Sequence, residues 1–203
     1  MPAKMIQAVI LAAGKSERMG SVKPLLSWGK RTLIEAIIDG VARSCAKEVL
    51  IVLGAARDDI EPVIAKHDLR TVFNPDFARG MLSSIQRGLE AVPHDARAVL
   101  FFLGDQPPPH PGMINRLIDA YRKTGKGIVL PVHGGRRGHP VLIDLKYRNE
   151  IGTLDPGIGL RQLMRDHPED VLEVRTRSPW VLLDIDTPED YERALASWRR
   201  RRK

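Results

Sequence analysis

The chain has almost no cysteine. Cys45 is its only cysteine among 203 residues, so neither an internal disulfide nor a cluster of cysteine ligands around zinc can form. So little cysteine is typical of a reducing compartment. Cys45 closes an apolar, helix-like pattern that starts at Leu33, which predicts a buried and unreactive thiol.

Long hydrophobic runs are absent as well. No apolar stretch approaches the roughly 20 residues of a membrane-spanning helix. The N-terminus enters a strand-like pattern at Ile6 without the apolar segment of a secretory signal. We therefore expect a soluble, cytoplasmic protein without a membrane partner.

Aromatic residues are scarce, at 5% of the chain, and they are not interleaved with basic residues. The formal charge of +7 is concentrated at one end: of 32 Lys and Arg residues, five form the run 199–203, leaving 27 basic against 25 acidic residues. This distribution predicts a solvated tail after a helix that ends at Trp198. It does not favour nucleic acid as a partner.

Short apolar runs alternate along the chain with segments in which apolar residues recur with helical periodicity. Strands are predicted at Ile6–Ala12, Val49–Leu53, Thr71–Phe73, Val99–Leu103, Gly127–Pro131 and Val141–Ile143. Helices are predicted at Leu33–Cys45, Asp59–His67, Ser83–Val92 and Met113–Lys123. This order is typical of one Rossmann-like, three-layer α/β domain with a mainly parallel sheet, over residues 1–198, followed by the basic tail 199–203.

The segment Leu11–Gly20, LAAGKSERMG, directly follows the first strand. Its backbone N–H groups, together with Ser16, Arg18 and Lys23, suit a polyphosphate. Neither of two common phosphate motifs fits, because a Walker A loop and a dinucleotide fingerprint need glycines that this segment lacks. The simpler alternative is a turn in which the glycines only supply unusual backbone angles.

Two further loops follow predicted strands, where the ligands of open α/β sheets bind. The second loop reads NPDFARGMLSSI, with Gly80 before a helix that holds Ser83 and Ser84 in its first turn. These hydroxyls suit either a ligand or the helix cap. The third loop places Asp105 before three prolines, which suits a rigid Mg²⁺ ligand, although Asp105 could instead cap the helix near Pro111.

A fourth loop at the same edge runs from Val181–Ile185 into DTPED. Thr187 and Asp190 stand in the register of a capping box, with proline at the first helical position. Helix capping accounts for these two residues but leaves Asp184 and Asp186 unexplained.

The segment His133–Val141, HGGRRGHPV, is basic and rich in glycine. It suits either an anion-binding loop or a polar hairpin turn. His139 could be taken for a general base or a zinc ligand, but no other His or Cys stands at ligand spacing. No metal is assigned to it.

Taken in order, LAAGKSERMG with Lys23, NPDFARGMLSS, GDQP, GRRGHPV and LDIDTPED closely resemble the molybdopterin nucleotidyltransferases, from about Ile6 to Tyr191. The chain is most similar to the branch that transfers CMP, the molybdenum cofactor cytidylyltransferases. The guanylyl-transferring branch usually has LAGG where this chain has alanine at position 13, and GHP at 138–140 matches the cytidylyl branch. A departure is that Arg136 and Arg137 precede Gly138, where a proline is common.

The resemblance implies a glycosyltransferase-A-like fold and Mg²⁺-dependent transfer of CMP from CTP to the terminal phosphate of molybdopterin or molybdenum cofactor. It also implies a molybdoenzyme or its chaperone as a partner. The implied nucleotide-binding residues are Leu11, Ala12, Ala13, Gly14, Ser16, Arg18, Lys23, Gly80 and Ser83. Arg18, Lys23 and Asp105 would be catalytic, Asp105 and Asp186 would bind the metal, and Asp184 is a further candidate. The acceptor would lie on Arg136, Arg137, Gly138 and His139.

Residue chemistry agrees with this implication. An acceptor phosphate is already a nucleophile, so the protein has only to bring two anions together, with Mg²⁺, Arg18 and Lys23 offsetting their charge. The alternatives are another phosphorylated acceptor, a non-catalytic cofactor carrier and a nicotinamide-dependent oxidoreductase. A carrier would not need both Asp105 and Asp186, and an oxidoreductase would require the missing dinucleotide fingerprint.

Overall fold

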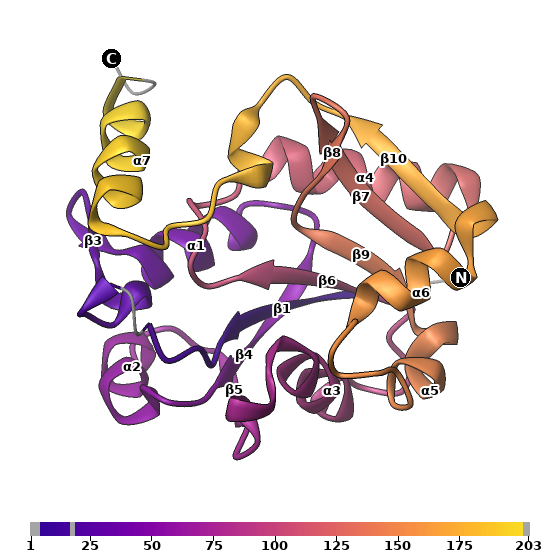
Figure 1. The fold of residues 1–203 in the computed structure, drawn as a ribbon, viewed down its shortest axis with the longest axis horizontal. Coiled ribbons are helices and arrows are strands. Elements are labelled where there is room, and N and C mark those ends of the chain that lie inside the picture. The colour runs from indigo at the N-terminus through magenta and orange to yellow at the C-terminus, as the bar shows by residue number, and fades with distance from the viewer. Residues whose placement is uncertain (1–4, 17–18, 201–203) are drawn as a thin grey trace.

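The computed structural model describes residues 5–16 and 19–200 and has one large, mainly parallel sheet (Figure 1). Its strand order is β10-β7-β9-β6-β1-β4-β5, with β8 paired to β7. The strands are β1 (Ile6–Ala12), β4 (Lys47–Leu53), β5 (Arg70–Phe73), β6 (Ala98–Leu103), β7 (Ile128–His133), β8 (Arg136–Arg137), β9 (Val141–Asp144) and β10 (Val171–Arg175). The antiparallel pairings are those made by β9 and by the short β8. A two-stranded ribbon, β2 (Ser27–Trp28) and β3 (Arg31–Thr32), lies apart from this sheet.

Strand β1 lies at the centre, between β4 and β6, and all seven of its residues are buried. Alternate side chains point to opposite faces: Ile10 packs in one hydrophobic cluster and Val9 in the other. A strand covered on both faces needs an almost continuous apolar run, which is why the sequence predicts it so clearly.

Helices cover both faces, as the alternating sequence pattern predicts. The α-helices are α1 (Leu33–Ala42), α2 (Arg57–Ile64), α3 (Met81–Ala91), α4 (Pro111–Thr124), α5 (Arg148–Ile151), α6 (Leu160–Asp166) and α7 (Pro188–Arg200). Residues of α1, α2, α4 and α7 belong to one core cluster and those of α3, α5 and α6 to the other. In Figure 1, α4 lies above the central strands and α3 and α5 lie below them. The three-layer α/β fold is thereby confirmed.

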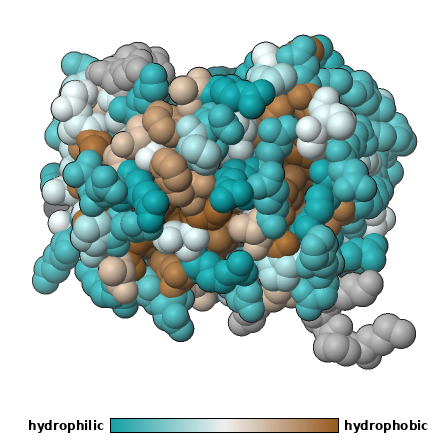
Figure 2. Space-filling model, turned by 90° about the horizontal axis from the view of Figure 1, so that it is seen from below, coloured by the Kyte–Doolittle hydropathy of each residue, from teal (hydrophilic) through white to brown (hydrophobic). Residues whose placement is uncertain are grey.

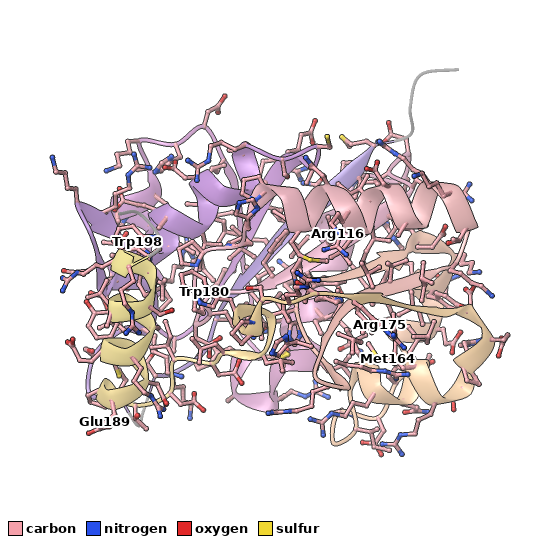
Figure 3. The ribbon with its side chains drawn as sticks, turned by 90° about the horizontal axis from the view of Figure 1, so that it is seen from above. Arg116, Met164, Arg175, Trp180, Glu189 and Trp198 are labelled. Atoms are coloured by element: carbon pink, nitrogen blue, oxygen red, sulfur yellow. The ribbon has the colours of Figure 1, made fainter. Side chains whose placement is uncertain are left out.

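Strand β10 was not predicted, because it lies at an edge of the sheet and alternates half-buried with exposed residues such as Glu173. The guanidinium of Arg116 on α4 donates a 2.7 Å hydrogen bond to the carbonyl oxygen of Arg175 at the end of β10 (Figure 3). At the other end of the molecule, Trp198 of α7 packs against Trp28, with ring centroids 5.6 Å apart. No helix in residues 5–16 and 19–200 is long and apolar enough to cross a membrane.

One expectation is wrong. Cys45 is exposed, because α1 ends at Ala42 and the thiol stands in the turn before β4. The segment Val181–Ile185, which leads into the fourth loop, begins in a short 3-10 helix, Pro179–Leu182, and continues as irregular chain. Its apolar residues contribute to the core, with Ile185 fully buried.

Candidate functional site

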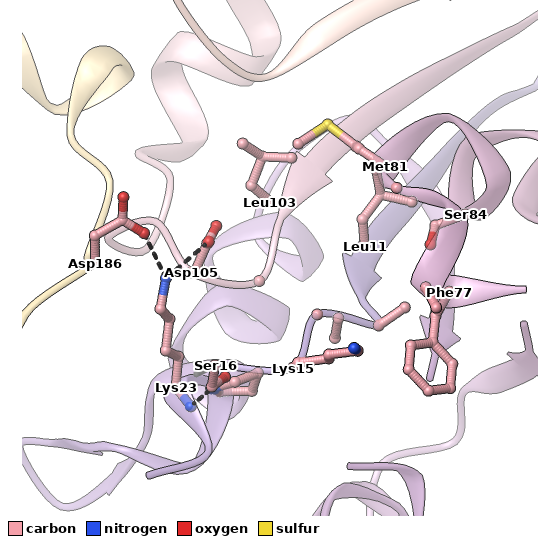
Figure 4. A pocket seen from close by; sticks show the side chains of 17 residues that line it. Leu11, Lys15, Ser16, Lys23, Phe77, Met81, Ser84, Leu103, Asp105 and Asp186 are labelled. Atoms are coloured by element: carbon pink, nitrogen blue, oxygen red, sulfur yellow. Dashed lines mark hydrogen bonds and ion pairs between the residues drawn. The ribbon is translucent and has the colours of Figure 1, made fainter. Parts of the chain in front are cut away.

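The first, second and third loops and Asp186 border one cavity of about 560 Å³ at the carboxyl ends of β1 and β6 (Figure 4). Its lining consists of loop segments together with the carboxylates of Asp105 and Asp186 and the side chains of Lys15 and Lys23. The lining residues are Leu11 to Ser16, Lys23, Pro24, Phe77, Ala78, Gly80, Met81, Ser84, Leu103, Gly104, Asp105 and Asp186. Carboxylates and cations in one cavity can bind a metal ion and a polyphosphate together.

Lys23 is the centre of the charged part of this cavity. Its Nζ lies 2.6 Å from Oδ1 of Asp186 and 3.4 Å from Oδ2 of Asp105, although these residues come from three distant parts of the chain. The side chain of Lys23 is only 9% exposed. Its backbone N–H donates a 3.1 Å hydrogen bond to Oγ of Ser16, so the first loop is tied to the lysine that it was predicted to accompany.

The two carboxylates are brought together by the backbone. The N–H of Ile185 donates a 2.9 Å hydrogen bond to the carbonyl oxygen of Asp105, which places Asp186 beside the end of β6. Helix α4 is capped by His110, whose Nδ1 accepts a 3.1 Å hydrogen bond from Gly112. Asp105 is therefore not the helix cap, and its carboxylate remains directed at Lys23.

Burial raises the pKa of Asp105, since surrounding protein replaces bulk water, while nearby Lys23 lowers it and Asp184 raises it. The side chain still keeps 40% of its surface exposed. A carboxylate whose negative charge is costly gains from a bound cation, which in this structure is the ammonium of Lys23. Two carboxylates on one cation also form a donor set that suits a hard divalent metal.

The first loop lies close to the neighbouring strand end. A Cβ on Gly54, just after β4, would stand 2.5 Å from the carbonyl oxygen of Ala13 and 2.7 Å from its Cβ, so only glycine allows this approach. Ala12 and Ala13 are buried while Gly14 is exposed, and all three line the cavity. Arg18 lies outside the described residues.

The second loop is organised by Asn74, a buried residue that was not predicted. Its amide nitrogen donates 3.0 Å hydrogen bonds to the hydroxyls of Ser83 and Ser84, and its Oδ1 accepts one from the N–H of Asp76. Ser83 in turn donates to the carbonyl oxygens of Asp76 and Gly80. Gly80 and Ser84 line the cavity, whereas Ser83 serves the loop and is outside the lining.

A second cavity, of about 590 Å³, adjoins the first and lies between α3 and α6. Leu11, Met81 and Leu103 line both. We call the second cavity the α3–α6 groove. Its lining is mainly apolar, with basic groups among it; residues of the basic segment and of α6 in the lining include Arg137, Gly138, His139, Arg161 and Arg165. Figure 2, from the side of α3 and α6, shows hydrophobic surface in hollows between hydrophilic side chains.

Of the four residues predicted in the segment His133–Val141, three line the α3–α6 groove: Arg137, Gly138 and His139. Arg137 is in ion contact with Glu173, 2.8 Å away. Burial lowers the pKa of His139, a shift that nearby Asp184 opposes. Arg136 is exposed, faces His133 in the β7–β8 ladder and is outside the lining of the groove.

Several lining residues were missed by sequence reasoning. Phe77, Ala78 and Met81 stand in the recognised second loop, but only the fold shows which of its side chains face the cavity. Arg161 and Arg165 lie in an unpredicted helix. No group of three or more His, Cys, Asp or Glu residues placed to hold a metal exists in the described part of the chain.

The chain resembles known proteins over most of its length. Residues 8–171 match the family model described as MobA-like NTP transferase domain. Molybdenum cofactor cytidylyltransferase of Escherichia coli (strain K12) is 29% identical, over 92% of this chain and 93% of that protein. Nicotine blue oxidoreductase of Paenarthrobacter nicotinovorans is 32% identical, over 94% and 96%. The crystal structure of Rv0371c from Mycobacterium tuberculosis H37Rv aligns with a TM-score of 0.86 at 28% identity, covering 97% of this chain and all of that one. A complex of Rv0371c with manganese aligns with a TM-score of 0.80.

Proposed function

The chain belongs to the family of MobA-like NTP transferase domains and is a nucleotidyltransferase, and from this premise we propose that it transfers CMP from CTP to the terminal phosphate of molybdopterin or molybdenum cofactor. The observation that carries this proposal is the meeting of Lys23, Asp105 and Asp186 in a cavity that opens into a second groove. Two adjoining cavities are what a reaction between two bound molecules requires.

In the proposed reaction, CTP occupies the first cavity. Its base and ribose lie against Leu11 to Gly14, near Gly80, Ser83 and Ser84, and its phosphates extend toward Ser16, Arg18 and Lys23. A phosphate oxygen of the acceptor attacks the α-phosphorus and forms a new P–O bond, while the bond to the bridging oxygen breaks and pyrophosphate leaves. Lys23 offsets negative charge on the phosphates and thereby lowers the barrier.

A divalent metal fits this site. Asp105 and Asp186 supply two carboxylates that already converge on one cation, and Mg²⁺ typically takes one or two carboxylates together with phosphate oxygens and water. When bound, Mg²⁺ would act as a Lewis acid on the phosphates. Lys23 would then be released from the carboxylates to the phosphates.

The acceptor belongs in the groove between α3 and α6. A largely apolar lining suits the flat ring system of a pterin, and Arg137, His139, Arg161 and Arg165 are placed for its anionic groups. The shared residues Leu11, Met81 and Leu103 would exclude water where the two substrates meet. Delivery of the product to a molybdoenzyme or its chaperone completes the proposal.

The test is incubation of the protein with each of the four NTPs, Mg²⁺ and molybdenum cofactor, following pyrophosphate. We expect pyrophosphate to be released from CTP only when the acceptor is present. The same preparation is assayed for oxidation of NADH and NADPH, because one relative is named an oxidoreductase. Binding of cofactor without pyrophosphate release would instead indicate a carrier, and release with a different phosphorylated acceptor would change the substrate.

A further inference from the structure

The segment from Val181 to Asp186 carries one of the two carboxylates, yet it has little regular structure to hold it. It leaves a 3-10 helix at Leu182 and reaches α7 only at Pro188. Its place beside Asp105 must therefore come from contacts with other parts of the chain. Ile185 is buried in the core, and Asp186 pairs with Lys23 and donates a hydrogen bond from its N–H to the carboxylate of Asp190. Three further hydrogen bonds join the segment to other parts of the chain.

The first contact is with the Gly138–Pro140 turn, between β8 and β9. The backbone N–H of His139 donates a 2.9 Å hydrogen bond to the carbonyl oxygen of Val181, and the N–H of Gly138 donates a 2.8 Å bond to that of Pro131 in β7. The turn is thus joined to the sheet on one side and to the Asp186 segment on the other.

The approach at Gly138 is unusually close. A Cβ at this position would overlap the carbonyl oxygen of Val181 and stand 2.8 Å from its carbonyl carbon. The obstructing atoms are backbone, which cannot turn aside as a flexible side chain can. Any side chain at position 138 must therefore push the turn and the Val181 segment apart.

Two further contacts lie nearer the carboxylate. Gln106, which is buried, donates a 2.9 Å hydrogen bond from Nε2 to Oδ1 of Asp184. The N–H of Ile185 donates to the carbonyl oxygen of Asp105 at 2.9 Å. Both join the segment to the loop after β6, which carries Asp105 itself.

We propose that Gly138 and Gln106 are positioning residues, which hold Asp186 in register with Asp105 and Lys23. The turn at 138–140 acts on this carboxylate through its backbone, while the side chains of Arg137 and His139 line the α3–α6 groove. The importance of this positioning for metal-dependent transfer rests on the proposed function. The structural link from the 138–140 turn and Gln106 to the segment that carries Asp186 does not depend on that function.

The experiment compares Gly138→Ala with His139→Ala, which removes the side chain but keeps the backbone N–H bonded to Val181. Amide hydrogen exchange followed by NMR reports directly on the N–H of Ile185. We expect exchange at Ile185 to accelerate at least about tenfold in Gly138→Ala and to stay at the wild-type rate in His139→Ala, with Val9 in β1 equally protected in all three proteins. Unchanged exchange at Ile185 in Gly138→Ala would overturn the proposal.

Gln106→Met provides a second variant, of similar volume but without the donor to Asp184. We expect Gln106→Met to accelerate amide exchange at Ile185 as well. If Gly138→Ala does not fold, this variant tests whether the contacts of the segment protect Ile185. Equal protection of Ile185 in wild type and Gln106→Met would contradict a positioning role for Gln106.

A kinetic arm distinguishes this role from direct contact with the acceptor. In the pyrophosphate assay we expect Gln106→Met, a change outside the lining of both cavities, to raise the Mg²⁺ concentration for half-maximal rate about tenfold, with the KM of the acceptor changed less than about threefold, since a metal ligand is displaced while the groove persists. A raised acceptor KM with unchanged Mg²⁺ dependence in Gln106→Met would overturn the proposal. Absence of transfer in the wild type would refute the proposed function, while the exchange data would still decide the link.

Discussion

At the scale of single residues, the charged cluster depends on a balance between two carboxylates and one lysine. Lys23 lies within 3.4 Å of both Asp105 and Asp186 and is almost fully buried. A buried ammonium needs such partners, because an isolated charge away from water is costly. The cluster is therefore a preformed cation site, which the ammonium of Lys23 fills in this structure.

We predict that Asp105→Asn reduces transfer at least about 100-fold while the protein stays folded, because an amide keeps the shape but lacks the charge that binds metal. The measurement is kcat for pyrophosphate release, with circular dichroism as the check on folding. Asp95→Asn, at an exposed aspartate before β6, is the matched control and should retain wild-type turnover. Activity of Asp105→Asn within about threefold of wild type would refute the metal assignment.

Ala13 leads to a second prediction at this scale. Its methyl group narrows the backbone approach at the first loop, so a purine should be disfavoured relative to a pyrimidine, and one methyl is worth about 1–3 kcal/mol. We expect kcat/KM for CTP to exceed that for GTP by about ten- to a hundredfold with the same acceptor, and Ala13→Gly to reduce this ratio. Equal values for the two nucleotides in the wild type would defeat the cytidylyl assignment and leave nucleotidyl transfer standing.

At the scale of elements, helix α1 begins with a capping box. The backbone N–H of Thr32 donates a 2.8 Å hydrogen bond to Oε2 of Glu35, and the N–H of Glu35 donates to the hydroxyl of Thr32. Lys66 lies 2.5 Å from the other carboxylate oxygen. Burial alone would raise the pKa of Glu35, but the bonds from Lys66 and Thr32 outweigh it and lower the pKa from 4.5 to about 2.

A folded-state pKa below the ordinary value means that the ionised carboxylate stabilises the protein above about pH 4.5 and that this contribution is lost as the pH falls toward 2. We predict that Glu35→Gln lowers the free energy of unfolding by about 1–3 kcal/mol at pH 7 and by much less at pH 2.5, measured by urea denaturation. Glu61→Gln, which removes an exposed i,i+4 partner of Arg57, should cost less than about 0.5 kcal/mol. An equal loss for Glu35→Gln at both pH values would contradict the assigned charge effect.

How far these elements could be predicted depended on whether their signals are local in the sequence. Strand β1 and the capping box of α7 follow from the sequence because their signals are local: a continuous apolar run, and Thr187 with Asp190 exchanging hydrogen bonds as their spacing requires. Edge strand β10 and helix α6 have weak local patterns and are placed by the sheet and by the core. Asn74 was missed for a related reason, because its hydrogen bonds to two serines exist only after the loop has folded.

At the scale of the whole molecule, most of the net positive charge lies at the C-terminal end of the sequence and not in the packed body of the fold. The body is nearly neutral, and the excess of basic residues lies at the end of α7, where Arg199 and Arg200 belong to the last helical turn. Trp198, the residue before them, packs on Trp28 and closely approaches Gly29. Trp198, which packs α7 against the rest of the protein, therefore directly precedes the basic run 199–203.

We predict that deletion of residues 199–203 leaves CTP affinity unchanged and shifts Tm by less than about 2 °C, since cations at a solvated helix end contribute little to stability. Calorimetric titration with CTP and a thermal melt are sufficient. Trp198→Ala is the informative companion and should lower Tm clearly, because it removes a packed aromatic ring. Lost CTP affinity in the truncated protein would show that the tail takes part in function.

The central proposal is that CMP passes from CTP in one cavity to an acceptor in the adjoining one. The most direct measurement is a reaction with CTP labelled at the α-phosphate, in which label recovered in the acceptor is compared with pyrophosphate formed. We expect one labelled CMP joined to molybdenum cofactor for each pyrophosphate released, and incorporation at least about 100-fold slower with Asp105→Asn. Label that stays in CTP, or that appears as free CMP without an acceptor adduct, would contradict this proposal.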